Sequence, residues 1–115
     1  MSRAATTSDV FNAIAEPRRR EIIALLAASS PRSVGELVDA MELAQPAVSK
    51  HLGVLRAVGV VTVEKAGKSR LYALNPQELK AVHDWVAQFD RLWTKQLDRV
   101  KERAEHKARE RAAKN

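Results

Sequence analysis

The sequence SVGELVDAMELAQPAVSKHLGVLRA, residues 33–57, decides the fold. Ser33 followed by Glu36 has the form of a capping box, so a short helix is expected to begin there. Pro46 suits the first turn of a second helix, and the apolar residues after it recur at the spacing of one helical face. Only residues 42–44 connect the two expected helices. Two short helices joined by so tight a connection predict a helix-turn-helix.

The outward face of the second helix has the composition of a DNA-recognition helix. Small residues allow close approach, amide and hydroxyl groups reach base edges, and cations contact phosphates. The candidate DNA contacts in this helix are Gln45, Pro46, Ser49, Lys50 and His51. The alternative interpretation is an ordinary amphipathic helix with a solvated polar face.

After Gly59 the pattern changes from helical to extended. Mostly β-branched residues at 60–63 and a second apolar run at 71–74 predict two strands of a hairpin. A basic turn that contains Gly67 joins them, as expected for the wing of a winged helix. The candidate DNA contacts of this wing are Lys65, Lys68, Ser69 and Arg70. A solubilising hairpin tip is the alternative, since edge strands often carry lysine.

Further helices are expected on both sides of this core. Caps and periodicity predict helices at about 8–15 and 17–28, and one last helix from about residue 75 to Val100. Beyond Val100 the charged helix formers predict a solvated helical extension that frays. Four helices, a hairpin and a helix make a mainly α protein with a small β-hairpin wing, an α+β winged helix-turn-helix of order ααααββα.

Length and charge agree with a small nucleic-acid-binding domain. The 115 residues suit one domain, and 20 Lys and Arg against 14 Asp and Glu give a net charge of +6. Residues 43–74 hold five basic residues and one acidic residue, and residues 99–115 hold seven and three. The positive charge therefore lies in two blocks, one at the expected recognition helix and wing and one in the C-terminal extension.

Several classes of function are excluded by what the sequence lacks. The chain contains no cysteine, which excludes disulfides, thiol catalysis and thiolate metal sites. Its apolar stretches are far shorter than the roughly 20 residues of a membrane span, and the N-terminus has no apolar signal core. No motif joins a nucleophile to a histidine and a carboxylate, and no glycine-rich phosphate loop is present. We expect a cytoplasmic protein that is not an enzyme, has no catalytic residues, contacts no membrane and needs no cofactor.

Three segments give the chain a specific resemblance. Residues 44–61, AQPAVSKHLGVLRAVGVV, resemble the recognition helix of ArsR/SmtB-type winged-helix repressors. Residues 16–23, EPRRREII, resemble the opening of that family's second helix, and residues 66–74, AGKSRLYAL, resemble its wing. The aromatic-rich residues 85–93, WVAQFDRLW, look like the metal-independent branch of the family. One departure is Ala44, where the family commonly has a Ser or Thr that caps the recognition helix.

The resemblance implies a homodimer that binds a pseudo-palindromic operator in double-stranded DNA. In such proteins the first and last helices pair across a two-fold axis, which suits the wide apolar stripe of the last helix. The candidate dimer residues are Phe11, Val82, Trp85, Phe89, Leu92 and Trp93. The alternative is that these aromatic residues form a plain intramolecular core. The expected organisation is a flexible N-terminus at 1–7, a DNA-binding and dimerisation domain at 8–100 and a charged extension at 101–115.

Metal sensing, which the family is known for, is not expected here. The region that would hold the cysteine site is Glu36–Met41, without cysteine. For the site of the last helix, His83 and Asp84 are present, but the next histidine is His106, too far along the chain to complete it. We therefore expect no metal, and the sequence leaves open a small-molecule effector that it does not identify.

The sequence thus predicts a sequence-specific DNA-binding transcriptional regulator. The favoured form is a dimeric repressor of its own or an adjacent operon, acting by occupying an operator that overlaps a promoter. One alternative is a nonspecific nucleoid-associated protein, which shares the basic charge but does not need the polar face around Gln45 and Ser49. The other is a protein-interaction winged helix that has lost DNA binding.

Overall fold

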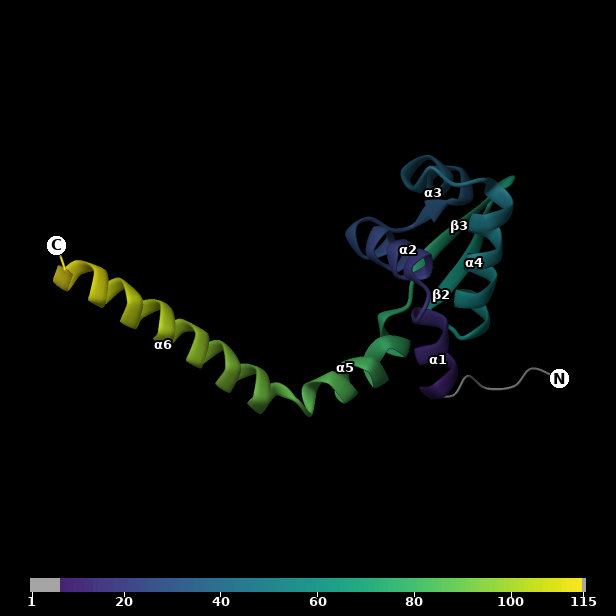
Figure 1. The fold of residues 1–115 in the computed structure, drawn as a ribbon. Coiled ribbons are helices and arrows are strands. Elements are labelled where there is room, and N and C mark those ends of the chain that lie inside the picture. The colour runs from purple at the N-terminus through teal and green to yellow at the C-terminus, as the bar shows by residue number, and fades with distance from the viewer. Residues whose placement is uncertain (1–6, 115) are drawn as a thin grey trace. The chain divides into compact units, whose positions relative to one another are not determined.

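The computed structural model describes residues 7–114, and its elements follow the expected order with additions (Figure 1). Of the expected N-terminal segment 1–7, residues 1–6 lie outside the described residues. The elements are α1 (Thr7–Ile14), α2 (Pro17–Ala28), β1 (Arg32–Ser33), α3 (Val34–Met41), α4 (Gln45–Ala57), β2 (Val61–Ala66), β3 (Ser69–Leu74), the 3-10 helix η1 (Pro76–Leu79), α5 (Lys80–Ala87) and α6 (Asp90–Lys114). The fold is mainly helical with a small β-sheet, as predicted.

The helix-turn-helix forms where local signals place it. The Ser33 hydroxyl accepts from the Glu36 amide at 3.2 Å, and the Glu36 carboxylate accepts from the Ser33 amide at 3.2 Å, so the predicted capping box is present. Helix α3 ends at Glu42, which has the left-handed φ of 54° and donates its amide to the Val38 carbonyl. Helix α4 then begins after Ala44, which offers no side-chain cap, as expected from the missing hydroxyl.

A single apolar core holds α1 to α4 and the sheet together. Its fully buried side chains come from α2, α3, α4 and the start of the wing: Ile22, Leu26, Leu37, Val48, Leu52, Leu55, Val60 and Val61. The residues at 48, 52 and 55 are the apolar residues of α4 whose spacing predicted one helical face. They anchor α4 by one face and leave its opposite face exposed.

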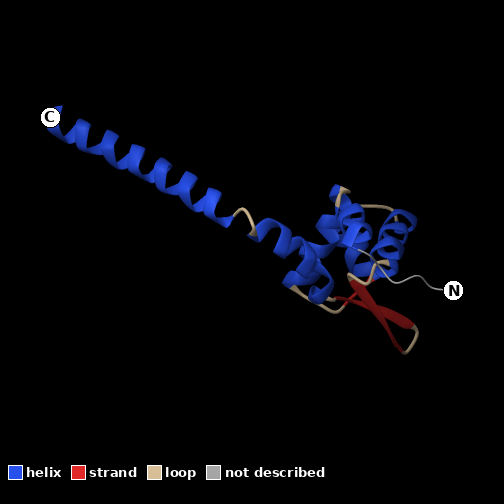
Figure 2. Ribbon diagram, turned by 90° about the horizontal axis from the view of Figure 1, so that it is seen from below, coloured by secondary structure: helices blue, strands red, loops and turns tan. Residues whose placement is uncertain are grey.

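The wing is the predicted hairpin, paired in register from Val61 opposite Leu74 to Ala66 opposite Ser69 (Figure 2). Gly67 occupies the two-residue turn with a φ of 62°, a conformation that glycine adopts without steric cost. The sequence did not indicate a third strand. Strand β1 pairs with β3, Arg32 opposite Tyr72 and Ser33 opposite Leu71, which makes the sheet order β1-β3-β2.

The prediction of one continuous last helix is wrong. The chain forms η1 and α5 and then interrupts the helix at Gln88 and Phe89 before α6 begins. At the interruption the Phe89 amide donates to the Val86 carbonyl at 3.0 Å, and the Leu92 amide donates to the Phe89 carbonyl at 3.0 Å. These i to i+3 bonds tighten the chain at the interruption, and the Phe89 carbonyl also accepts from the Trp93 amide at 3.1 Å, where the α-helical pattern resumes. Beyond Val100 the helix continues to Lys114 and its described side chains are exposed.

The chain divides into two compact units, Met1–Val82 and His83–Asn115. The first contains the helix-turn-helix and the wing, and the second contains most of α5 and all of α6. Across residues 7–114, none of the helices combines the length and the hydropathy that crossing a bilayer requires.

Candidate nucleic-acid interface

Helix α4 presents a polar, sterically open face to solvent. Gln45, Ser49, Gly53 and Arg56 follow one another by three or four residues and are all exposed, with Lys50 beside them. This face lies opposite the buried apolar stripe of the same helix. An amide, a hydroxyl and two cations along one exposed helical face can address base edges and phosphates.

Gly53 is a residue of this face that the sequence analysis did not single out. A Cβ built at this position meets nothing within 4 Å, so packing inside the protein does not require a glycine. Its backbone is helical, so no unusual φ requires one either. Glycine in a helix interior lowers stability relative to alanine. Its position on the open face suits the close approach of a large partner to the helix backbone.

The wing brings like charges together close to its tip. Lys65 and Arg70 are direct cross-strand partners, and like charges placed opposite one another destabilise a hairpin. Lys65, Lys68, Ser69 and Arg70 are all exposed, so the four predicted wing residues share one hairpin end. Lys65 and Arg70 also line a surface hollow of about 250 Å³ together with Arg56 of α4. The wing and α4 therefore contribute cations to the same hollow.

The basic side chains of this surface differ from the arginines elsewhere in the first unit in their hydrogen bonds and ion pairs. Within the described residues, the side chains of Lys50, Lys65, Lys68 and Arg70 have no hydrogen bond and no ion pair. A positive surface without internal partners is the electrostatic footprint of a polyanion-binding site.

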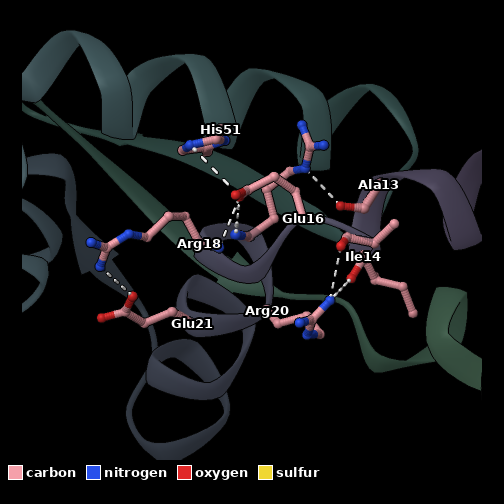
Figure 3. A network of polar contacts seen from close by, with 9 residues as sticks. Ala13, Ile14, Glu16, Arg18, Arg20, Glu21 and His51 are labelled. Atoms are coloured by element: carbon pink, nitrogen blue, oxygen red, sulfur yellow. Dashed lines mark hydrogen bonds and ion pairs between the residues drawn. The ribbon is translucent and has the colours of Figure 1, made fainter.

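The run Arg18-Arg19-Arg20 shows the contrasting case (Figure 3). Arg18 forms an ion pair with Glu21 at 3.0 Å. Arg19 donates to the Ala13 carbonyl at 2.7 Å, and Arg20 donates to the carbonyls of residues 14 and 15 at 2.9 and 3.0 Å. Arg19 and Arg20 thus satisfy carbonyls at the C-terminal end of α1, which have no partner within their own helix. They hold α1 against α2 and are not part of the candidate interface.

His51 occupies a different place from the other predicted contacts of α4. Its side chain is only 18% exposed, and its Nε2 lies 3.9 Å from the Glu16 carboxylate. That carboxylate caps α2 by accepting from the amides of Arg18 and Arg19 at 2.8 and 3.2 Å (Figure 3). Nδ1 of His51 is buried without a hydrogen-bond partner among the described residues. His51 is therefore directed toward the start of α2 and does not share the open face.

The predicted dimer residues are distributed over both units. In the first unit Phe11 of α1 is half-buried, and Val82 packs against the core. In the second unit Trp85 and Phe89 form an edge-to-face pair with ring centroids 5.3 Å apart. Trp85, Leu92 and Trp93 are each more than half exposed, as are Leu97 and Val100. So much exposed apolar surface on α5 and α6 is characteristic of an interface.

His83 and Asp84, which match only part of the family's last-helix metal site, also lie at the surface. Nδ1 of His83 lies 3.4 Å from the Asp84 carboxylate, and both side chains are exposed. Among residues 7–114, no three His, Asp or Glu side chains gather closely enough to hold a metal ion.

The fold and this surface together define a winged-helix DNA-binding protein. The family model described as "Bacterial regulatory protein, arsR family" matches residues 16–63, which run from the cap of α2 into the wing. The chain is 37% identical over 97 residues to the HTH-type transcriptional regulator Rv2034 of Mycobacterium tuberculosis, covering 84% of this chain and 87% of that one. It is 45% identical over 71 residues to the transcriptional repressor SmtB of the same species, covering 62% of this chain and about half of SmtB, 52%.

Solved structures agree with these sequence matches. The crystal structure of an ArsR family transcriptional regulator has a TM-score of 0.64 and 31% identity, covering 76% of this chain and 94% of that one. The chain belongs to the ArsR family. It is a DNA-binding transcriptional regulator and not an enzyme.

Proposed function

We propose that the protein is a dimeric repressor that reads a pseudo-palindromic operator with α4 and the wing. The observation that carries this proposal is the open face of α4, where Gln45, Ser49 and Lys50 stand next to a wing whose cations have no partner among residues 7–114. Gln45 and Ser49 contact base edges in the major groove, and Lys50 contacts a neighbouring phosphate. Pro46, at the start of α4, shapes the helix end that approaches the groove.

The wing supplies affinity through phosphates and not through bases. Lys65, Lys68 and Arg70 neutralise backbone charge, and the Ser69 hydroxyl adds a hydrogen-bond donor at the hairpin end. Phosphate binding at Lys65 and Arg70 also removes the repulsion between these cross-strand partners. Residues 43–74 carry a net charge of +4, so two copies on one duplex make affinity fall steeply with salt.

Binding to DNA is tested by selecting bound duplexes from a random pool with the full chain. The expected product is a two-fold symmetric sequence that binds far more tightly than random DNA. The double variant Ser49→Ala/Lys50→Ala is expected to lose this discrimination, whereas Gln77→Ala, an exposed change in η1, keeps it. Equal affinity for selected and random DNA would support a nonspecific nucleoid-associated protein. Failure of the wild type to retain any DNA would support a protein-interaction module.

The homodimer is supported by the apolar residues exposed on the second unit, together with Phe11 and Val82 on the first. Burying Leu92 and Trp93 against a second copy would remove the large apolar surface of α6 from water. On this proposal residues 8–100 form the DNA-binding and dimerisation part. Sedimentation of the wild type is expected to give a dimer, and Trp93→Glu a monomer with unchanged helix content. A wild-type monomer at micromolar concentration contradicts the proposal.

Repression is proposed because occupancy of an operator that overlaps a promoter blocks transcription sterically, and SmtB, a relative, is named as a repressor. A reporter driven by the promoter next to the selected operator is expected to fall when the protein is present and to recover with Ser49→Ala/Lys50→Ala. A reporter that rises with the wild-type protein would make it an activator and overturn this part of the proposal.

A further inference from the structure

Helix α6 carries an unbroken row of positive charges. Every fourth residue from 95 to 111 is basic, and all five side chains are exposed. We call this row the basic ladder: Lys95, Arg99, Arg103, Lys107 and Arg111. At about 1.5 Å of rise per residue, successive cations are separated by about 6 Å along the helix axis and the ladder is about 24 Å long.

Internal pairing does not explain the basic ladder. Among the described residues, none of its five side chains has an ion pair or a hydrogen bond, although the same helix pairs His106 with Glu110 at 3.0 Å. Like charges at i,i+4 lie next to one another on a helix and destabilise it. The ladder contains four such repulsive pairs in succession, whereas only three of its members have a carboxylate at i+3, namely Asp98, Glu102 and Glu110. An anionic partner would relieve the remaining repulsion.

A second row of the same helix shows what an ordinary solvated face looks like. Lys101, Glu105 and Arg109 also follow one another at i,i+4, but their charges alternate and compensate. Successive members of an i,i+4 row advance by about 40° around a helix, so the basic ladder follows a spiral on α6 that contains five of the nine basic residues of this helix. A regular row of cations about 24 Å long matches a linear polyanion better than it matches a compact acidic ligand.

The partner chemistry follows from what accompanies the ladder. The large apolar residues of α6 end at Val100, and the ladder continues for eleven more residues with only alanines as apolar neighbours. That part of the helix has nothing to insert into a lipid surface, which disfavours a membrane. Because the recognition surface of the same chain binds DNA, the phosphates of the duplex that flanks this site are the nearest linear polyanion.

We propose that α6 is a second DNA contact, with the basic ladder lying along the phosphate backbone of the duplex that flanks the operator. This inference rests on the proposed operator binding by α4 and the wing. It assigns the charged C-terminal extension a task that is independent of base sequence. The ladder adds affinity and salt dependence, whereas α4 retains the discrimination between sequences.

The test compares two variants of the full chain that each remove two positive charges from α6. Arg103→Gln/Lys107→Gln interrupts the basic ladder, and Lys101→Gln/Arg109→Gln removes the same charge from the alternating row. The probes are two duplexes with the same selected operator, one ending at its edges and one extended by about 15 base pairs on each side. Helix content by circular dichroism, matched among the three proteins, shows that any difference comes from charge.

The wild type is expected to bind the extended duplex more tightly than the short one, and the ladder variant is expected to bind both alike. The salt slope is the fall in the logarithm of the binding constant per unit rise in the logarithm of salt concentration. Each neutralised phosphate adds about 0.9 to this slope, so losing two contacts per copy lowers it by about 1.8. Between 50 and 200 mM salt, wild-type affinity should then fall about 12-fold further than that of the ladder variant for each engaged α6. The alternating-row variant is expected to keep the wild-type preference and slope.

Two results would overturn the inference. One is a ladder variant that keeps the wild-type slope and length preference. The other is equal loss in both variants, which would mean that only total charge matters. If the ladder variant loses binding to anionic lipid vesicles and retains wild-type DNA binding, the partner is a membrane and the DNA inference fails. A failure of operator binding itself is distinguishable, because the wild type would then not discriminate the selected operator from random DNA.

Discussion

Replacing Gly53 with alanine should make the protein more stable and a weaker DNA binder. The added methyl group meets no atom within 4 Å, so it introduces no clash, and alanine loses less backbone entropy on folding. The expected gain is about 0.5–1 kcal/mol in the free energy of unfolding. On the open face of α4 the same methyl group holds the helix backbone away from the base edges. We expect operator affinity to fall at least tenfold, equivalent to about 1.4 kcal/mol.

Two measurements on the same protein separate these effects. Urea denaturation gives the change in stability, and titration of the selected operator at fixed salt gives the change in affinity. The control is Ala24→Gly, which makes the reverse exchange at an exposed position of α2. It should lower stability by a similar amount and leave operator affinity unchanged.

If Gly53→Ala gains stability and binds the operator as tightly as the wild type, the duplex does not approach the backbone of α4 at this point. If the variant loses stability, an atom of the protein must occupy the space beside Gly53, and the face of α4 is not open there.

Three further changes test the fold. Ser33→Ala removes the capping box of α3 and should cost about 1 kcal/mol in urea denaturation, with Ser33→Asp restoring most of it; an unchanged midpoint would mean that the cap contributes nothing. Ala44→Ser supplies the absent cap of α4 and should raise stability by about 1 kcal/mol, visible as a higher thermal midpoint than that of Ala44→Val. Leu52→Ala opens a cavity at a 1% exposed core position and should cost about 2–5 kcal/mol, whereas a loss below 1 kcal/mol would contradict the packing of α4.

The parts of the fold that the sequence predicted are those with strong local signals. Pro17 opens α2, the Ser33 and Glu36 pair opens α3, and Gly67 forms the wing turn, all as predicted. Each of these signals involves four neighbouring residues or fewer, so it can be recognised in the sequence without knowledge of the tertiary structure. The exposed face of α4 was predictable for the same reason, because helical periodicity alone separates it from the buried stripe.

The features that the sequence did not predict have two causes. Some depend on contacts between residues far apart in the chain, and one depends on a small free-energy difference between the α-helix and a tighter turn. Strand β1 is two residues long and exists only because Tyr72 and Leu71 lie beside it. His51 faces Glu16, 35 positions earlier, which no periodicity can indicate. The interruption at Gln88 contains neither Gly nor Pro, so the apolar spacing through this region gave no sign of it.

Strand β1 has a mechanical consequence for the DNA-binding surface. Ser33 is at once the partner of Leu71 in the wing strand β3 and the cap of α3. Backbone pairing between β1 and β3 therefore connects the hairpin to the helix-turn-helix, in addition to the covalent connections at the two ends of the hairpin. In the proposed mode of DNA binding, α4 and the wing therefore keep a fixed mutual orientation before contact, so association loses little conformational entropy in aligning them.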